Sequence, residues 1–327
     1  MKHLILVLLL VISVTGQAQL YKVESPFAHT YSIVARDEVT GEMAVAVQSH
    51  WFNVGGVVSW GEAGVGVVAT QSFVNKSFGI RGLALIKEGK TAQEALDILL
   101  ATDEGRAVRQ VSILDAEGNV ATHTGESCIK YAGHIKGDNY SVQANMMLTD
   151  EVWPAMANAY ELNYGLPLPE RMLAVLEAAE KAGGDIRGKQ SAALLVVQGE
   201  KLENIWDDPM IDLSVEDAEN PLEELKRLLK VYRAYEHMNN GDLAVEHGDM
   251  QKAMAAYGSA QKMFPNNLEM QYWTAITLAN QGELEKAKPI LKRVFARDEN
   301  WRELTRRLPE AGLLELSEEE IDQLLAL

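Results

Sequence analysis

Cysteine is nearly absent from this sequence, and its scarcity excludes two common ways of holding a protein together. A single cysteine, Cys128, rules out an intramolecular disulfide and any metal site built from several thiolates. Basic residues are also scarce, because 30 Lys and Arg stand against 47 Asp and Glu and leave a net charge of −17. Both halves of the chain are acidic, so neither offers the basic surface that nucleic acid or an anionic membrane requires. We therefore expect no nucleic-acid partner.

Long apolar runs are missing as well, apart from one at the N-terminus. No later segment reaches the roughly 18 consecutive apolar residues that a membrane-spanning helix needs. Hydrophobic residues nevertheless make up 47% of the chain and charged residues 24%, as in folded globular proteins. At about 150 residues per domain, a length of 327 residues predicts two domains.

The N-terminal apolar run has the pattern of a secretory signal peptide. Lys2 supplies a positive charge, residues 4–14 are apolar, and small residues precede a cleavage point after Ala18. The run is too short to cross about 30 Å of hydrocarbon as a helix, which leaves an uncleaved anchor as the alternative. We predict a signal peptide over 1–18, a linker or propeptide over 19–29, and an exported protein, periplasmic or extracellular.

Valine-rich runs bounded by glycine predict a layered α+β domain over residues 30–215. The expected strands are 31–37, 43–49, 54–60, 64–73, 109–115, 120–127, 140–147, 191–198 and 201–208. The expected helices are 82–88, 91–103, 151–161 and 169–183. Several strands are apolar almost throughout, so part of the sheet should be covered on both faces. Thr91 and Glu94 form the pattern of a capping box at a helix start.

From about residue 216 the sequence predicts only helices and contains an internal repeat. Small and large apolar residues recur with the roughly 34-residue period of the tetratricopeptide repeat. The first copy is marked by Gly248, Asp249, Ala253, Tyr257, Ala260 and Pro265, and the second by Gly282, Glu283, Ala287, Leu291, Val294 and Glu299. We predict an all-α tetratricopeptide-like domain over 216–327, which would bind a protein or peptide partner. Ser317 and Glu320 predict a second capping box in its last helix.

Thr30 stands immediately before the first predicted strand of the α+β domain. In N-terminal-nucleophile (Ntn) hydrolases, a Thr, Ser or Cys begins such a strand and attacks a carbonyl carbon with its side chain. Its own α-amino group takes the proton, and a pKa of about 7.7–8.0 suits that group to act as a base at neutral pH. The alternative is that Thr30 is only a β-branched residue that begins a strand.

Several blocks of residues resemble one known family. They are Thr30–Asp37, Ala44–Ser49, Glu62–Gly66, Ala69–Gln71, Arg109–Val111, Thr124–Cys128, Ala132–His134, Gln143–Asn145 and Gly183–Ala193. Together they resemble the prokaryotic family known as domain of unknown function 1028, which is grouped with the Ntn hydrolases. The resemblance implies a four-layer αββα Ntn sandwich with a nucleophile at Thr30, and it implies no particular substrate.

The predicted processing departs from that family pattern. Members often begin Met-Thr, so that loss of Met frees the threonine, whereas cleavage after Ala18 would leave residues 19–29 ahead of Thr30. A threonine in mid-chain has no free α-amino group. Either a second cut occurs between His29 and Thr30, which Ntn precursors commonly make themselves, or the protein is not a working Ntn hydrolase.

Polar residues at strand ends supply further candidates for the site. Asn145 and Ser191 are predicted to be catalytic beside the nucleophile, because strand-end amides and hydroxyls can donate to an oxyanion. Gln71 and Gln190 are predicted to bind substrate. Arg187 could bind a substrate carboxylate through its planar guanidinium. Each has a structural alternative, since these residues could instead hydrogen-bond within the domain and the glycines around Arg187 could mark a turn.

Other reactive residues are weaker candidates. Cys128 is a rival nucleophile, but its neighbours offer no clear field that would stabilise a thiolate. Three histidines, at positions 50, 123 and 134, lack the spacing of common zinc motifs, so we expect no metal and no cofactor. Asp37 should serve the turn that follows the first strand rather than the site.

Two functions from different classes follow. The first is an exported Ntn-type amidohydrolase that cleaves an amide of unknown identity through Thr30, with a tail that binds a partner or forms a homo-oligomer. The second is a non-catalytic Ntn-fold scaffold that acts through its repeats. Because a fold does not determine a function, the geometry around Thr30 must decide between them.

Overall fold

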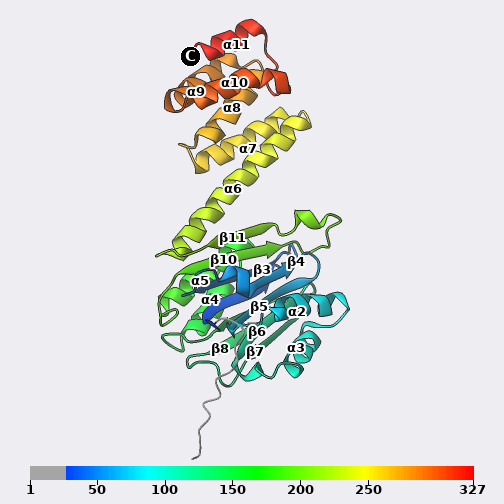
Figure 1. Ribbon diagram of the computed structural model, residues 1–327. Coiled ribbons are helices and arrows are strands. Elements are labelled where there is room, and N and C mark those ends of the chain that lie inside the picture. Colours follow the sequence, from blue (N-terminus) through cyan, green and yellow to red (C-terminus); the bar gives the residue numbers. More distant parts are fainter. Residues whose placement is uncertain (1–26) are drawn as a thin grey trace, which may run out of the picture. The chain divides into compact units, whose positions relative to one another are not determined.

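A computed structural model describes residues 27–327, which divide into two compact units. One unit ends at Leu225, and the other runs from Lys226 to Leu327. Strands occur in the first unit, whereas the second is built from helices (Figure 1). The predicted signal peptide and the linker up to residue 26 lie outside the described residues.

A six-stranded antiparallel sheet carries Thr30. Its strands are β2 (Thr30–Arg36), β3 (Met43–Ser49), β8 (Gly133–Gly137), β9 (Tyr140–Ala144), β10 (Ser191–Val197) and β11 (Ile211–Val215). They are arranged in the order β11-β10-β3-β2-β9-β8. Strand β3 is buried along its whole length, as its continuous apolar sequence predicts for a strand covered on both faces.

A second antiparallel sheet packs against the first. It consists of β1 (Phe27–Ala28), β4 (Ser59–Glu62), β5 (Gly66–Phe73), β6 (Arg109–Asp115) and β7 (Val120–Thr124). Its order is β1-β5-β6-β7, and β4 also pairs with β5. Val34 and Val45 from the first sheet join Val67 and Leu114 from the second in one buried cluster. The apolar residues between the two sheets thus form a core of the unit.

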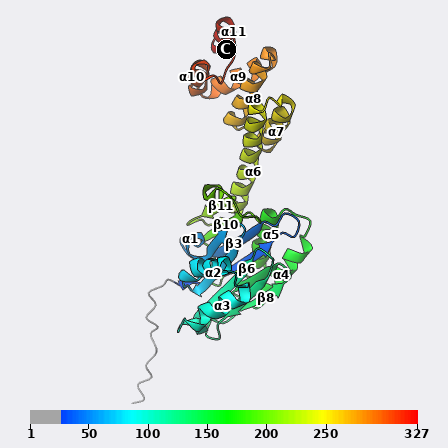
Figure 2. The ribbon, with the colours of Figure 1, turned by 90° about the vertical axis from the view of Figure 1, so that its right-hand side faces the viewer.

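Two pairs of helices cover the sheets. Helices α2 (Ser77–Lys87) and α3 (Ala92–Ala101) pack on β5, β6 and β7. Helices α4 (Val152–Leu162) and α5 (Leu168–Lys181) pack on β2, β3 and β9 (Figure 2). The α+β class predicted from the sequence is confirmed. The Thr91–Glu94 capping box is present at the start of α3, and Asp37 accepts from the amides of Val39 and Thr40, as a turn residue does.

Some predicted boundaries were wrong. The run 54–60 is not one strand, because its first part forms a helical turn, α1 (Gly55–Val58), before β4. The Asn53 side chain contacts that turn by accepting from the amide of Gly56 at 3.0 Å. The helix expected over 82–88 begins earlier, at Ser77. Strand β8 was missed because its five residues, two of them glycine, carry little β signal.

The last strand of the first unit also lies later than predicted. Residues 201–208 form no strand and contain only a short 3₁₀ turn, Ile205–Asp207, whereas β11 pairs with β10 from Ile211 onward. The Asp208 carboxylate accepts from the amide of Ala63 at 2.8 Å and so ties this segment to the β4–β5 turn. That long-range contact has no signal in the local sequence.

The second unit consists of helices with the predicted repeat. They are α6 (Pro221–Glu246), which begins just before the boundary between the units, α7 (Met250–Met263), α8 (Leu268–Asn280), α9 (Leu284–Arg297), α10 (Asn300–Arg307) and α11 (Glu318–Leu325). Ala253 on α7 and its counterpart Ala287 on α9 are fully buried. Gly248 and Gly282 both adopt a left-handed conformation, with φ of +73° and +78°, in the turns before these helices. The repeat read from the sequence is therefore present in the structure.

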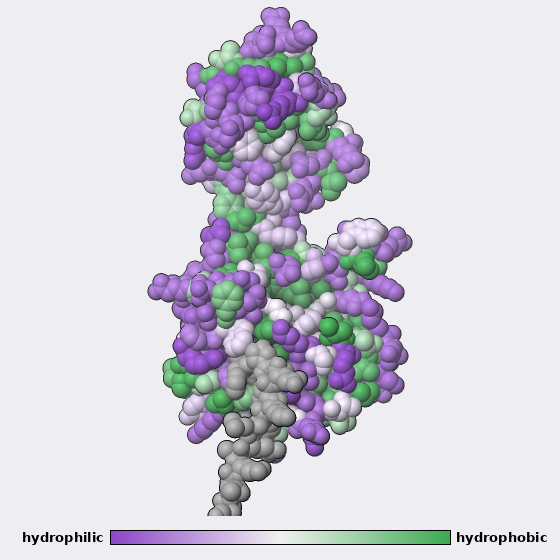
Figure 3. All heavy atoms as spheres, in the orientation of Figure 1, coloured by the Kyte–Doolittle hydropathy of each residue, from purple (hydrophilic) through white to green (hydrophobic). Residues whose placement is uncertain are grey.

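The surface of the helical unit is mostly polar. Hydrophilic residues cover most of the face that Figure 3 shows, with apolar residues scattered among them. The Ser317–Glu320 capping box begins α11 as predicted. Within residues 27–327, no helix combines the length and the apolarity needed to cross a membrane.

Candidate functional site

Thr30 is the first residue of β2 and is fully buried. It pairs with Ser49 on β3, and its carbonyl oxygen accepts from the amide of Asn145 at 3.1 Å. Its side-chain oxygen, Oγ1, is buried and has no hydrogen-bond partner among the described residues. Buried hydroxyls are normally paired, because an unpaired one forfeits its bonds to water. An unpaired hydroxyl at this position is therefore a candidate nucleophile.

The carbonyl group just before Thr30 is held by two side-chain donors. The His29 carbonyl oxygen accepts from Ser49 Oγ at 2.6 Å and from Arg187 Nη2 at 2.8 Å. Arg187 is itself fixed by Asp185, whose carboxylate accepts from Nε at 3.0 Å and from Nη2 at 2.6 Å. The Asp185 side chain is fully buried. A cationic and a neutral donor thus point at one oxygen, as they would to stabilise negative charge there.

Asn145 contacts residues on both sides of the His29–Thr30 peptide bond. Its Nδ2 donates to Gln110 Oε1 at 2.9 Å and lies 3.4 Å from the Thr30 carbonyl oxygen. Its Oδ1 lies 2.8 Å from Nδ1 of His29, whose ring also packs edge-on against Phe73 at 5.9 Å between centroids. Asn145 therefore holds the two residues in a fixed relation.

The environment of His29 favours an uncharged ring. Burial is the main cause that lowers the pKa of the imidazole below its ordinary value of 6.5. The hydrogen bond to Asn145 raises the pKa, whereas the nearby positive charge of Arg187 lowers it further. The ring is therefore neutral at neutral pH, and Nδ1 can donate to the Asn145 oxygen.

A layer of buried amide and hydroxyl side chains lies between the sheets beside Thr30. Gln71 Nε2 donates to the Thr30 carbonyl at 3.1 Å and to Gln110 Oε1 at 2.7 Å. Ser32 donates to Gln71 Oε1 at 2.6 Å, and Gln143 donates to Ser32 at 3.2 Å. Because each of these groups has partners, the layer is rigid and fixes the backbone of Thr30.

The structure brings four of the six predicted site residues together. Thr30, Asn145, Gln71 and Arg187 all lie at the His29–Thr30 bond. Gln71 is fully buried, and its Nε2 donates to the Thr30 carbonyl oxygen and to Gln110 Oε1, so it holds the backbone of Thr30.

The remaining two predicted residues lie farther away. Ser191 pairs with Ser49 on the neighbouring strand, which places it two strand spacings, about 10 Å, from Thr30. Its hydroxyl accepts from the amide of Val54 at 3.1 Å. The Gln190 side chain donates to Asp217 at 3.0 Å at an exposed position, while its backbone amide donates to the Ser49 carbonyl at 3.0 Å.

Sequence reasoning missed Ser49 and Asp185. The signal for Ser49 was present, because a hairpin that pairs Arg36 with Met43 must also pair Thr30 with Ser49. Asp185 stands two residues before Arg187 in the sequence. Its carboxylate accepts hydrogen bonds from the Arg187 guanidinium only because the chain turns between them, and the sequence alone does not show that turn.

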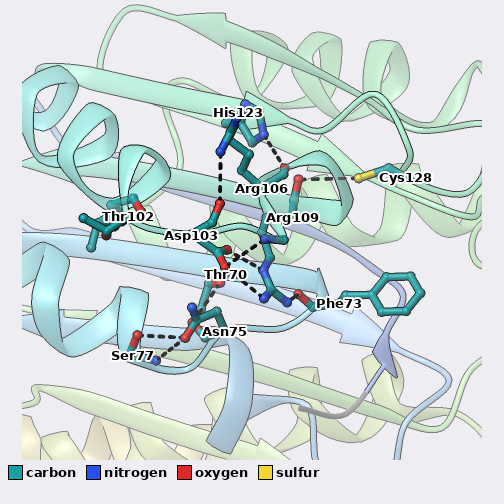
Figure 4. A network of polar contacts seen from close by, with 12 residues as sticks. Thr70, Phe73, Asn75, Ser77, Thr102, Asp103, Arg106, Arg109, His123 and Cys128 are labelled. Carbon is teal, nitrogen blue, oxygen red and sulfur yellow. Dashed lines mark hydrogen bonds and ion pairs between the residues drawn. The ribbon is translucent and has the colours of Figure 1, made fainter. Parts of the chain in front are cut away.

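Arg109 holds Phe73, which packs against the His29 ring. Its Nη1 donates to the Phe73 carbonyl at 2.5 Å, and its Nε forms an ion pair with Asp103 at 2.7 Å (Figure 4). Cys128 donates to the Arg109 carbonyl at 3.5 Å. Burial raises the pKa of the Cys128 thiol, which disfavours the reactive thiolate.

Two of the three histidines considered as metal ligands have other partners for their rings. His123 Nε2 lies 2.9 Å from the Arg106 carbonyl oxygen, and His134 Nδ1 lies 2.8 Å from Thr124 Oγ1. In the part of the chain that the structure describes, no group of three or more His, Cys, Asp or Glu side chains is placed to hold a metal ion.

Comparison with known proteins gives two family matches. The model of a family of unknown function, DUF1028, matches residues 30–225, and a tetratricopeptide repeat model matches residues 244–308. The crystal structure of a protein from Silicibacter pomeroyi, described with the same DUF1028 family, is similar with a TM-score of 0.56. The two chains are 30% identical over 62% of this chain and 88% of the other. No protein with curated function matches this chain.

Proposed function

The chain belongs to the DUF1028 family, and from that premise and the geometry at Thr30 we propose that it is an Ntn amidohydrolase. The two sheets with helices on their outer faces are, in this proposal, the four-layer αββα sandwich of that superfamily. One observation carries the proposal: a buried, unpaired threonine hydroxyl adjoins a peptide carbonyl that Ser49 and Arg187 hold. Thr30 is also the first residue that the family model matches.

The first step in this proposal is cleavage of the His29–Thr30 bond by the protein itself. Thr30 Oγ1 attacks the His29 carbonyl carbon, and the negative oxygen is stabilised by Arg187 and Ser49. A donor of this kind contributes about 3 kcal/mol to a transition state. The carbon–nitrogen bond breaks, and the Thr30 nitrogen takes up the proton that the hydroxyl lost. This break frees the Thr30 amine, and water then hydrolyses the resulting ester, which releases the His29 carboxylate and restores the Thr30 hydroxyl.

The freed amine completes the catalytic group. With a pKa of about 7.7–8.0, the α-amino group accepts the proton of Oγ1 as the hydroxyl attacks a substrate amide. It then gives that proton to the leaving amine, and water hydrolyses the acyl ester. Arg187 and Ser49 would stabilise the oxyanion in both halves, while Asn145 and Gln71 position Thr30.

The helical unit has a separate role. Tetratricopeptide repeats suggest protein–protein interaction, and the match over residues 244–308 supports a tail of that kind. We propose that the protein is exported, processed first after Ala18 and then before Thr30, and that its tail recruits a protein partner or a second copy of the chain.

Mass spectrometry of the purified protein tests this proposal directly. Protein from an exporting host should begin at Thr30. Thr30→Ala should leave the preceding residues attached, whereas Thr30→Ser should still be processed because it keeps a hydroxyl. Arg187→Lys and Ser49→Ala should each slow processing by about 10²-fold or more.

The matched control is Thr70→Ala. Thr70 is as deeply buried as Thr30, but its hydroxyl donates to the Asn75 carbonyl at 3.4 Å, away from the site. This variant should be processed normally. Cleavage before residue 30 in the Thr30→Ala variant would contradict self-processing. A protein that hydrolyses an amide while it keeps the preceding residues would exclude Thr30 as the nucleophile and favour another active group.

A further inference from the structure

The segment before the proposed cleavage point occupies the edge of a sheet. Strand β1 pairs antiparallel with β5, with Phe27 opposite Phe73 and Ala28 opposite Ser72. Strand β4 pairs with another part of β5, from Gly66 to Ala69. The chain ahead of Thr30 is therefore bound as an added strand, a mode in which backbone hydrogen bonds provide affinity.

We infer that the substrate is a peptide, whose acyl half binds in extended form along the edge of β5 where residues 27–29 lie. This inference rests on the proposed function. In self-processing, residues 27–29 form the acyl half of the bond that is cut, and the His29 carbonyl lies where the carbonyl of any later substrate must lie. The contacts of residues 27–29 are then the contacts that select the substrate.

The side chain of the residue next to the cleaved bond is enclosed by the protein. The His29 side chain is buried, with the Phe73 ring on one side and Asn145 Oδ1 at 2.8 Å. The Arg109 guanidinium donates to the Phe73 carbonyl oxygen and so fixes the backbone that carries this ring (Figure 4). An aromatic wall with one buried acceptor suits a neutral, planar side chain that carries an N–H donor. Histidine meets that description, and asparagine and glutamine carry the same kind of donor.

Simple acyl amides fit this site less well. A fatty-acyl or acetyl group offers no backbone N–H or C=O to β5 and no donor to Asn145. The polar groups of the site would then lose partners on binding, which disfavours such ligands strongly at a buried position.

Binding of a synthetic peptide tests the inference without requiring turnover. The protein is a chain that begins at Thr30 and keeps every described element except β1. The probe is dye-labelled Ser-Pro-Phe-Ala-His with a free carboxylate, the sequence of residues 25–29, followed by fluorescence anisotropy. Neighbouring residues of an antiparallel strand alternate between hydrogen-bonded and non-bonded pairs. We therefore expect N-methylation at one of Phe and Ala to weaken binding about tenfold and methylation at the other to have little effect.

The histidine pocket has its own control. Replacing the final His of the peptide by Leu should weaken binding to the parent chain, and this difference should shrink in Asn145→Ala. Absence of binding, or binding that neither methylation changes, would overturn the peptide inference.

A hydrolysis assay separates this inference from the proposed function. The same peptide is offered as an anilide beside octanoyl anilide. Peptide binding without hydrolysis would leave the substrate class standing and remove Thr30 as nucleophile. Hydrolysis of octanoyl anilide at a rate equal to that of the peptide would keep the nucleophile and overturn the peptide class.

Discussion

The hydroxyl of Thr30 differs in its bonding from those of the buried threonines in the helical unit. In the helical unit, Thr274, Thr277 and Thr305 each donate to the carbonyl four residues earlier, at 2.7, 3.0 and 2.9 Å. A helix always presents such an acceptor to a threonine, because the carbonyls of the preceding turn lie beside it. In the first unit, Thr30 begins a strand, where no such carbonyl lies beside the side chain, and its hydroxyl has no partner among the described residues. Thr70, in the same unit as Thr30, is also paired, so the unpaired hydroxyl is a property of the position of Thr30 and not of its unit.

Removing the hydroxyl from each kind of threonine should give opposite results. Thr30→Val keeps the side-chain volume but should abolish processing, a loss of order 10³-fold or more, and the chain should melt no lower than the parent. Thr305→Val should leave processing unchanged. It should lower the stability of the helical unit by about 1–3 kcal/mol, because Tyr272, 3.0 Å from Thr305 Oγ1, loses its partner.

Calorimetry and intact mass measure the two effects in the same samples. A clear drop in melting temperature for Thr30→Val would show that its hydroxyl has a structural role and would erase the contrast between the units.

Overpacking the repeat tests whether the helical unit is a tetratricopeptide pair. Ala253 is fully buried on α7, so Ala253→Leu should cost about 1–3 kcal/mol of unfolding free energy. Gly258, on the same helix, faces open space, and Gly258→Ala should instead stabilise by about 0.5–1 kcal/mol. Denaturant unfolding of the full chain measures both. Equal effects would contradict close packing at Ala253.

Acidification should loosen residues 27–29 in a chain that cannot process itself. Because the pKa of His29 is lowered in the folded state, the unfolded state binds the extra proton more readily. The stability that His29 contributes is complete above its ordinary pKa of 6.5 and declines as the pH falls below it. Thr30→Val should therefore lose more stability between pH 7.5 and 5.5 than the same chain with His29→Phe. Parallel pH profiles of the two chains would exclude this coupling.

The smallest effect is expected at the remaining thiol. Burial raises the pKa of Cys128, and no described cation lies in contact with its sulfur, so Cys128→Ser should be processed within a few-fold of the parent rate. A loss approaching that of Thr30→Val, in a chain that stays folded, would move the nucleophile to Cys128.

Much of the architecture could be predicted because it depends on local patterns. Valine runs, capping boxes and the repeat spacing act over a few residues, and the α+β class and the helical tail follow from them. The strand predicted over 201–208 was wrong because its path is decided by a distant contact, that of Asp208 with Ala63.

The site was predictable in part for the same reason. Thr30, Asn145 and Gln71 could be proposed because each lies at or near a strand end, where side chains converge. Arg187 was proposed for a substrate carboxylate, whereas the structure places it on the His29 carbonyl. That placement depends on the turn that contains Asp185 and on the order of β10, β3 and β2, neither of which a single sequence displays.

The side-chain amides in the layer beside Thr30 each have one fixed orientation of oxygen and nitrogen. Gln71 and Asn145 both donate to the same oxygen of Gln110, so turning that amide over would set three NH₂ groups against one another. Each neighbour is thereby held in a single orientation, and the Asn145 oxygen is left facing His29. The layer thus determines which ring nitrogen of His29 carries the proton. Gln110 makes no described hydrogen bond with His29 or Thr30. A substitution at Gln110 would nevertheless change the tautomer of His29, the residue next to the bond that is cut.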